Sequence, residues 1–471
     1  MATSKRPSSS LAVVVMAAGM GKRLKSKTPK VLHPVCGRPA LRYVLEAARK
    51  VRPASIIVVV SHGAEDVVEA VKSWGIRPEP IFVDQGTPMG TGHAVMVAES
   101  AVGKATEVLV LPGDNPLIAG AMLSDTMRVH RRKRATATVQ TAELPDARGY
   151  GRIIRNGSDF VRIAEDRDAT PAERAVREVA TSVYAFDRAA LFGALPLVGT
   201  DNSQREYYLP DVLGILTDKG EPVAVAQADF GGSLDINSRA SLARVTSAMR
   251  ERINSELMDS GVTITDPAAT FIDFGVRVGA DTTILPGTFL EGDTRIGAGC
   301  VIGPSTRIVD SKIADGAEVT FSVVKDSRIG ADACIGPYAH VRPGTVLAAG
   351  SKAGSFVEIK GSRVGRGSKV PHLSYVGDAE IGDGVNIGAA TVTVNYDGYS
   401  KHRTRIEDDA RIGSDTMLVA PVHVGKGAVT GAGSVITRDV PAGALAVERS
   451  EQRIVKGYRK RKDAEHGKGK G

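Results

Sequence analysis

This 471-residue sequence has few aromatic residues, few cysteines and no long apolar run. Phe, Trp and Tyr together make up 4% of it, and Trp74 is the single tryptophan. The three cysteines, Cys36, Cys300 and Cys334, are widely spaced and form no C-x-x-C pair. This spacing argues against a disulfide or zinc framework and favours a reducing, cytoplasmic compartment. Because no apolar run approaches the roughly 20 residues that span a bilayer, we expect no membrane association.

Positive charge is concentrated near the C-terminus. The formal net charge is +8, and the segment 449–471 holds nine Lys and Arg against three Asp and Glu, which leaves +2 for the rest. A short basic tail is more often solvated than bound to nucleic acid, so we expect no nucleic-acid partner. At the other end, Lys5 and Arg6 before the apolar run 11–18 imitate a signal peptide. The glycines that follow at once assign that run to a buried strand instead.

Glycine is abundant, at 52 residues, and it accompanies a six-residue repeat of aliphatic residues between Ile272 and Ile436. A period of six fits neither an α-helix, at about 3.6, nor a half-buried strand, at about 2. It is typical of a parallel β-helix, whose short strands each bury one aliphatic side chain and turn a corner on a small residue. The repeated positions are Ile272, Val278, Ile284, Leu290, Ile296, Ile302, Ile308, Ile313, Val319, Ile329, Ile335, Val341, Leu347, Val364, Val370, Val376, Ile406, Ile412, Leu418 and Val424.

A β-helix buries its core between neighbouring coils and leaves long outer faces free. Three copies packed side by side would cover those faces, so we expect a homotrimer. The repeat is interrupted at 394–401 (VNYDGYSK), where a loop could extend towards a site. We therefore expect the C-terminal half to be a catalytic scaffold.

The N-terminal segment combines an apolar strand, a glycine-rich loop and basic residues. Leu11–Met16 is expected to be a buried strand, and the loop GMGKRL (19–24) follows it. In α/β folds this arrangement presents backbone N–H groups to phosphates, and basic side chains add positive charge. The loop is not a dinucleotide fingerprint, because Leu24 stands where a third glycine is needed. A plain tight turn remains the alternative for these residues alone.

Strands and helices alternate after this loop. Ser55–Val60 and Glu107–Leu111 are predicted strands, Ala64–Trp74 is a predicted helix, and an amphipathic helix over 238–258 leads into the repeats. This alternation predicts a mostly parallel sheet with binding sites at the carboxyl ends of its strands. Asp114 follows such an end, where a carboxylate could hold Mg²⁺ beside a triphosphate, or simply cap a turn.

The order of the motifs carries a resemblance to a known family. In the N-terminal half they are AAGMGKR, TPKVLHP, DQGTPMGTGHA, PGDNPL, GYGRI, AEDRDAT, EYYLPD and INSR. In the C-terminal half they are RPG, FVEIK, KVPHLSYVGDAEIG, NIGA, VNYDG, GSDTMLVAPVHVG and GAGSVITRDVP. Over nearly its full length the chain resembles the bacterial bifunctional N-acetylglucosamine-1-phosphate uridylyltransferases/glucosamine-1-phosphate acetyltransferases.

The resemblance implies a fold and a division into domains. The fold is an α/β nucleotidyltransferase domain, Rossmann-like with a mostly parallel sheet, followed by a left-handed parallel β-helix of hexapeptide repeats. We expect the uridylyltransferase domain at 1–237, a linker helix at 238–262, the acetyltransferase domain at 263–449 and a basic tail at 450–471. The implied product, UDP-N-acetylglucosamine, supplies precursors of cell-wall peptidoglycan and lipopolysaccharide.

For the first domain the resemblance implies Mg²⁺-dependent uridylyl transfer from UTP to N-acetylglucosamine 1-phosphate, with pyrophosphate released. Arg23 and Lys30 would neutralise charge that builds on the phosphates, and Asp114 and Asn237 match the family's metal ligands. The amide of Gln85 could pair with the uracil edge. The residues that match nucleotide and sugar contacts are Met16, Ala17, Ala18, Gly19, Lys30, Gln85, Gly90, Thr91, Pro112, Gly113, Asp114, Gly151, Glu165 and Asn237.

For the second domain the resemblance implies acetyl transfer from acetyl-CoA to glucosamine 1-phosphate. His372 matches the general base that takes a proton from the substrate amine. The residues that match sugar-phosphate contacts are Arg342, Lys360, Tyr375 and Asn386. Those that match the acetyl-CoA groove are Ala389, Asn395, Tyr396, Ser414, Ala432 and Arg449.

Three positions depart from the family pattern. Lys22 stands where threonine is usual, and Tyr458 where tryptophan is usual. The usual Glu-x-Asn-x-Gly is Glu178-Val179-Ala180-Thr181-Ser182 here, and Ala180 cannot supply the amide that family members turn to the sugar. Either Thr181 or Ser182 compensates for that amide, or the sugar site is altered.

Two other functions compete with the bifunctional one. The chain could be a nucleotidyltransferase whose β-helix serves only as a trimer scaffold, but the presence of His372 argues against that. It could also be a non-catalytic sugar-nucleotide sensor. The joint presence of Lys30, Asp114 and Asn237 argues against a sensor.

Overall fold

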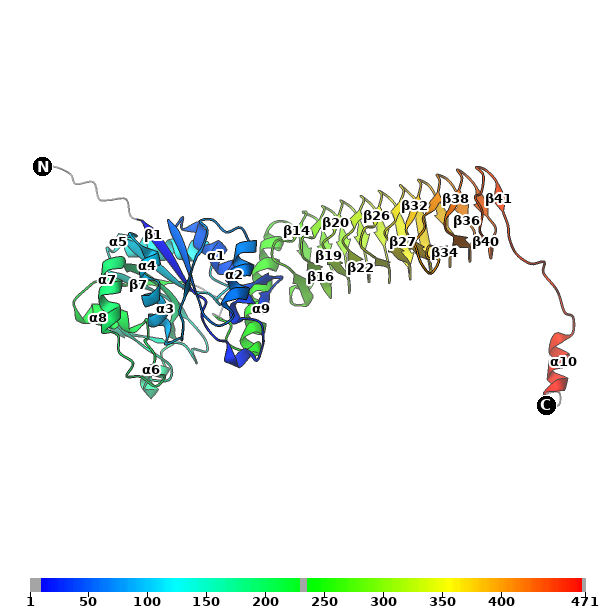
Figure 1. Cartoon of the computed structure of the whole chain (residues 1–471). Coiled ribbons are helices and arrows are strands. Elements are labelled where there is room, and N and C mark those ends of the chain that lie inside the picture. The colour runs from blue at the N-terminus through cyan, green and yellow to red at the C-terminus, as the bar shows by residue number, and fades with distance from the viewer. Residues whose placement is uncertain (1–9, 229–234, 468–471) are drawn as a thin grey trace, which may run out of the picture. The chain divides into compact units, whose positions relative to one another are not determined.

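The computed structural model describes residues 10–228 and 235–467 (Figure 1). It divides into two compact units, Met1–Ile253 and Asn254–Gly471. The division falls within helix α9 (Arg239–Asp259), which overlaps the predicted linker. Lys5, Arg6 and parts of the predicted segments 1–237 and 450–471 lie outside the described residues. Within the described ranges, no helix is long and apolar enough to cross a membrane.

The first unit is built on a mostly parallel sheet, as predicted. In this sheet β1 (Leu11–Met16) lies between β6 (Glu107–Pro112) and β4 (Ser55–Val60) and is parallel to both, while β10 (Glu178–Asp187) is antiparallel to β6 and β7 (Ala137–Glu143). A hairpin of β8 (Arg152–Asn156) and β9 (Asp159–Ala164) pairs with β10. In order across the sheet the strands are β11 (Val223–Gln227), β7 (Ala137–Glu143), β10 (Glu178–Asp187), β6 (Glu107–Pro112), β1 (Leu11–Met16), β4 (Ser55–Val60) and β5 (Ile81–Asp84).

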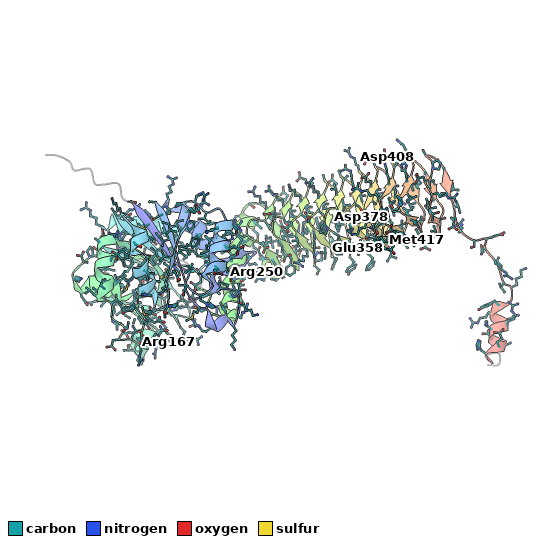
Figure 2. The ribbon with its side chains drawn as sticks, viewed as in Figure 1. Arg167, Arg250, Glu358, Asp378, Asp408 and Met417 are labelled. Atoms are coloured by element: carbon teal, nitrogen blue, oxygen red, sulfur yellow. The ribbon has the colours of Figure 1, made fainter. Side chains whose placement is uncertain are left out.

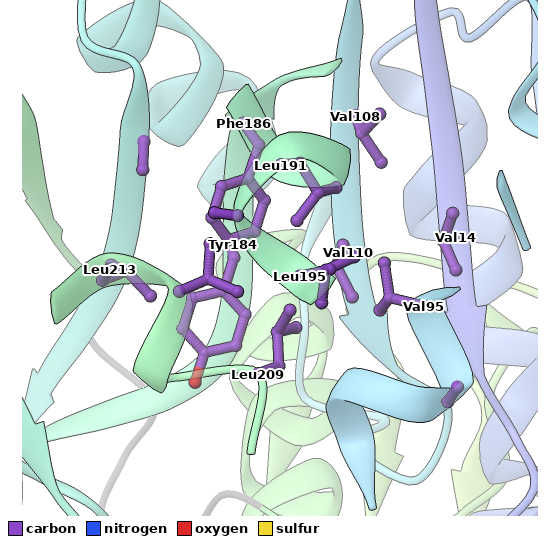
Figure 3. Close-up of a cluster of buried hydrophobic side chains, with 14 of the residues drawn as sticks. Val14, Val95, Val108, Val110, Tyr184, Phe186, Leu191, Leu195, Leu209 and Leu213 are labelled. Atoms are coloured by element: carbon purple, nitrogen blue, oxygen red, sulfur yellow. The ribbon is translucent and has the colours of Figure 1, made fainter. Parts of the chain in front are cut away.

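Apolar strands and helices form the core of this unit. The central strands β1, β4 and β6 are almost wholly buried, which explains their continuous Val, Ile and Leu runs. In Figure 3 the side chains of Val14, Val108 and Val110 from the sheet face a cluster that includes Tyr184 and Phe186 of β10. The helices are α1 (Ala40–Lys50), α2 (Ala64–Ser73), α3 (Thr91–Val97), α4 (Glu99–Val102), α5 (Gly120–Arg132), α6 (Pro171–Arg174), α7 (Arg188–Ala194) and α8 (Asp211–Asp218). This packing fixes the strand ends from which the first site is built.

The second unit is a parallel β-helix of the left-handed hexapeptide type. Its described strands form three sheets, which begin at β12 (Thr263–Ile264), β13 (Thr270–Ile272) and β14 (Arg277–Val278). From β12 to β40 each paired strand bonds the strand three positions later, so each coil adds one strand to every sheet, and the last pair joins β39 to β41. All the predicted repeat positions are buried except Val278, which is half-buried in the first coil. The six-residue prediction is therefore confirmed at every position but Val278.

Candidate active sites

A pocket of about 360 Å³ lies at the carboxyl ends of the central strands of the first unit. Met16 ends β1, Pro112 ends β6, and Asp114 follows two residues later. The two strand ends are joined because Gly113 N donates to Met16 O at 2.9 Å. The predicted residues that line this pocket are Met16, Ala18, Gly19, Lys30, Gln85, Gly90, Thr91, Pro112 and Asp114. Arg23 is exposed in a short 3₁₀ turn and does not line the pocket.

A cationic side chain lies between the two predicted metal ligands. Lys30 Nζ is 2.5 Å from Asp114 Oδ2 and donates to Asn237 Oδ1 at 2.7 Å. The fold therefore brings together three residues that are far apart in the sequence. Asp114 and Asn237 direct their oxygens at one position, which the Lys30 ammonium occupies.

Asp235, which sequence reasoning missed, lies beside this group. Its carboxylate accepts from Tyr150 Oη at 3.0 Å and from Asn237 Nδ2. Burial and the nearby Asp114 carboxylate raise the pKa of Asp235, while Lys30 lowers it. No local motif marks this residue, because only the fold places it beside Asp114.

The oxygens of Asp114, Asp235 and Asn237 fit a hard divalent cation, since Mg²⁺ prefers carboxylate and amide oxygens. The ammonium of Lys30 already occupies a position between two of them. Across the described ranges there is no group of three or more His, Cys, Asp and Glu side chains that could hold a metal. A metal here would thus use the Asn237 amide together with carboxylates and oxygens of a bound substrate.

The residues expected around the base are tightly arranged. Gln85 Nε2 donates to Gly90 O at 3.0 Å and lies 3.2 Å from His93 Nδ1, so Oε1 is the end left for a ligand. Gly90 has a φ of 105°, and a Cβ there would lie 2.5 Å from Tyr207 O, so only glycine fits. Thr91 Oγ1 accepts from Leu209 N at 3.0 Å, which anchors the same loop.

The sugar side of the pocket contains the departure from the family pattern. Ala180, Thr181 and Ser182 all line the pocket, where a bulge shifts the register between β10 and β7. Thr181 Oγ1 is directed away, because it donates to the backbone and side-chain oxygens of Gln140, both at 3.1 Å. Thr181 therefore does not compensate for the missing amide. Ser182, at a φ of 63°, hydrogen-bonds Tyr184.

Gly151 and Glu165 lie next to this segment. Gly151 O accepts from Ala180 N at 2.9 Å, and a Cβ on Gly151 would lie 3.3 Å from Glu165 Oε1. Burial raises the pKa of Glu165 to about 7, and the neighbouring Asp211 carboxylate adds to this shift. The fold therefore places Gly151 against Ala180 and Glu165 beside Gly151, although neither predicted sugar contact lines the pocket itself.

In the second unit, basic side chains gather after β25 (His340–Val341) and at the end of β28 (Glu358–Lys360). Arg342 Nη1 lies 2.7 Å from Glu358 Oε1, and Lys360 Nζ lies 3.2 Å from Asp378 Oδ2. Asp378 also accepts from Asn395 Nδ2 at 2.6 Å. Glu358 and Asp378, the carboxylates that hold these cations, are labelled in Figure 2. Asn395, expected in the acetyl-CoA groove, thus has its amide directed to the cationic cluster.

Lys401 joins this cluster and was not assigned from the sequence. The neighbouring ammonium of Lys360 lowers the pKa of Lys401, because two positive charges repel each other. Two neighbouring positive charges favour the binding of an anion between them. The signal that could have identified Lys401 is its position at the end of the loop 394–401, which interrupts the repeat.

Five of the other predicted residues, His372, Ala389, Ser414, Ala432 and Arg449, follow one corner of the β-helix in successive coils. His372 ends β30 (Lys369–His372), is exposed, and accepts from Ala390 N at 3.3 Å through its backbone carbonyl. In the following coils, Ala389 O accepts from Asp415 N at 2.7 Å, and Ala432 O accepts from Arg449 Nη1 at 3.1 Å.

Ser414 belongs to the same corner, since its carbonyl accepts from Gly433 N at 2.9 Å. A Cβ on Gly413 would lie 2.6 Å from Ala432 N, so glycine is required where these coils stack. His372, Ala389, Ser414, Ala432 and Arg449 therefore form a continuous row. Such a row suits an elongated ligand that ends at His372.

Tyr375, Asn386 and Tyr396 are not gathered into one group by the single chain. Tyr375 begins β31 (Tyr375–Gly377), in the same sheet as β28 and opposite Glu358. Asn386 begins β33 (Asn386–Ile387) in the sheet of β30. Tyr396 is 57% exposed, and its hydroxyl donates to Gly398 O at 2.6 Å.

Comparisons with known proteins agree with both halves of this description. Residues 13–231 match the model of the MobA-like NTP transferase domain, and residues 403–438 match the bacterial transferase hexapeptide model of six repeats. The chain is 50% identical to the bifunctional protein GlmU of Heliobacterium modesticaldum, over 95% of this chain and 98% of that protein.

It is 47% identical to the bifunctional protein GlmU of Streptomyces avermitilis, over 96% of this chain and 94% of that protein. Identity to the protein of the same name from Brevibacillus brevis is also 47%, over 94% of this chain and 96% of that protein. These matches extend through both units. The chain therefore belongs to the family of bifunctional GlmU proteins.

Proposed function

We propose that this chain catalyses two consecutive reactions of UDP-N-acetylglucosamine synthesis. The first is acetyl transfer from acetyl-CoA to glucosamine 1-phosphate, and the second is Mg²⁺-dependent uridylyl transfer from UTP to N-acetylglucosamine 1-phosphate. The observation that carries the proposal is that one chain holds both a pocket with converging oxygen ligands and, in its β-helix, a cationic cluster and an exposed histidine. The product would supply precursors of peptidoglycan and lipopolysaccharide.

In the acetyl-transfer site, the phosphate of glucosamine 1-phosphate would bind Arg342, Lys360 and Lys401. The neutral imidazole of His372 takes a proton from the substrate amine as nitrogen attacks the thioester carbonyl carbon. Collapse of the tetrahedral intermediate breaks the carbon–sulfur bond and releases coenzyme A. The row of residues from Ala389 to Arg449 would hold the acetyl-CoA with its thioester at the His372 end.

In the uridylyl site, an oxygen of the sugar phosphate attacks the α-phosphorus of UTP and pyrophosphate leaves. Gln85 Oε1 is placed to accept from the uracil ring N–H, because its Nε2 is used on Gly90 O. Lys30 would stabilise the negative charge of the phosphates, and Arg23, from the loop 19–24, would add a second positive charge. Asp114 and Asn237 would hold the Mg²⁺, which neutralises phosphate charge when bound.

We also propose that the protein is a homotrimer through its β-helix. Phe321, Tyr338 and Phe356 follow one another along one corner in successive coils; the first two rings are tilted with centroids 5.7 Å apart, and the last two are stacked at 5.2 Å. They are 39%, 57% and 60% exposed, and Leu373, next to His372, continues the row at 62%. Exposed apolar rows of this size are typical of contact surfaces, and a second copy would cover this one. Sedimentation equilibrium at micromolar concentration should give three times the chain mass, and a monomer would contradict the assembly.

We propose a cytoplasmic compartment for the enzyme, because Cys36, Cys300 and Cys334 are all free thiols. The experiment that tests the two reactions is to incubate the protein with glucosamine 1-phosphate, acetyl-CoA, UTP and Mg²⁺, and to identify the products by mass. We expect coenzyme A, pyrophosphate and UDP-N-acetylglucosamine. A single-activity nucleotidyltransferase would form the nucleotide sugar only when N-acetylglucosamine 1-phosphate is supplied, and a sensor would form neither product.

A further inference from the structure

Asp235 connects two side chains at the edge of the uridylyl pocket. Tyr150 Oη donates to Asp235 Oδ1 at 3.0 Å, and Asn237 Nδ2 donates to Asp235 Oδ2. Both carboxylate oxygens thus have a fixed partner, and the carboxylate is held on one side of the Asn237 amide. None of the family motifs assigns a role to this residue.

The orientation of the Asn237 amide follows from this contact. An asparagine amide has a donating end and an accepting end, and a carboxylate accepts only from the donating end. With Nδ2 directed to Asp235, Oδ1 faces the opposite side, where it accepts from Lys30 Nζ at 2.7 Å. The same ammonium is 2.5 Å from Asp114 Oδ2. It therefore marks the position on which the two predicted metal ligands converge, and the amide presents its oxygen there.

We propose that Asp235 is a positioning residue of the uridylyl site, which holds the Asn237 amide with its oxygen towards a divalent cation. Its carboxylate also adds negative charge beside Asp114, since Ile236 N donates to Asp114 O at 3.2 Å and keeps the two segments together. A rotated amide would direct its NH₂ group at the cation and repel it. The inference rests on the proposed function, which assigns that cation to Asp114 and Asn237.

The test measures cation affinity directly, with Mn²⁺ as the probe and the free ion followed by electron paramagnetic resonance. Residues that orient a metal ligand typically contribute about 10–100-fold to affinity. Asp235→Ala removes both the hydrogen bond and the charge, so we expect its Mn²⁺ affinity to fall by about that factor. Asp235→Asn keeps an acceptor for Asn237 Nδ2 but loses the charge. We expect a smaller loss, of more than twofold.

Asp114→Ala serves as the matched variant and tests the proposed function separately. If Asp114→Ala loses Mn²⁺ binding and Asp235→Ala binds within twofold of the wild type, the role of Asp235 is refuted while the cation site stands. If Asp114→Ala also binds like the wild type, the proposed cation site is refuted, and the role of Asp235 with it. A merely structural Asp235 would lower the melting temperature of the metal-free protein without changing Mn²⁺ affinity. If Asp235→Ala does not fold, the Mn²⁺ affinity of Asp235→Asn is the test. An affinity within twofold of the wild type would then refute the role of Asp235.

Discussion

Replacing Ala180 with asparagine should strengthen the binding of the sugar phosphate in the first unit. Ala180 lines the pocket beside Gly151, and the neighbouring Thr181 hydroxyl is used on Gln140, so no amide faces the sugar from this strand. One additional hydrogen bond to a sugar hydroxyl is worth roughly 0.5–1.5 kcal/mol. Since about 1.4 kcal/mol is a tenfold change, we expect the KM for N-acetylglucosamine 1-phosphate to fall by about 2- to 12-fold.

The assay is the initial rate of uridylyl transfer at saturating UTP and Mg²⁺, with the sugar phosphate varied. Ala180→Leu is the matched control, because leucine has nearly the shape of asparagine but neither donates nor accepts a hydrogen bond. The leucine variant should show no decrease in KM. If the asparagine variant also shows none, Ser182 already supplies the contact and the gap does not exist. If both variants lower KM equally, packing and not a hydrogen bond is responsible.

Two further predictions concern single charged side chains. Lys401→Ala should raise the KM for glucosamine 1-phosphate several-fold and leave the KM for acetyl-CoA unchanged, because Lys401 lies against Lys360 in the cationic cluster; equal changes in both constants would contradict this. Burial raises the pKa of Glu165 to about 7 from 4.5, so the folded state holds this proton more tightly than the unfolded state. The first unit should therefore lose up to about 3 kcal/mol of stability between pH 4.5 and 7, and Glu165→Gln should remove that dependence in thermal melts. An unchanged pH dependence in the glutamine variant would show that Glu165 is not its source.

The elements predicted best were those with a strong, regular pattern. Leu11–Met16 and Ser55–Val60 match β1 and β4 residue for residue, because buried parallel strands are apolar throughout. The predicted strand Glu107–Leu111 extends by one residue to Pro112. The six-residue repeat identified the β-helix because its narrow core admits one aliphatic side chain per strand. In both cases the residues that are apolar in the sequence are the ones that the fold buries, so the pattern alone predicts the element.

The details of the sites depended on long-range contacts that no local pattern records. Asp235 and Lys401 lie among functional side chains only because the fold brings distant segments together. The Gln85 amide looked free to pair with a base through both ends, yet one end is used on Gly90 O. Thr181 looked able to replace a missing amide, yet its hydroxyl is used on Gln140. The sequence gives the residue type, and the partner that each polar group has already taken comes from the fold.

The measurement that tests the central claim most directly is the activity of His372→Ala in both reactions. A single proton transfer contributes about 10²–10⁴-fold, so acetyl transfer should fall by that factor. Uridylyl transfer from supplied N-acetylglucosamine 1-phosphate should be unchanged, because His372 belongs to the β-helix unit and the uridylyl pocket belongs to the other. Normal acetyl transfer by the variant would contradict the role of His372, and loss of both activities together would contradict two separable sites.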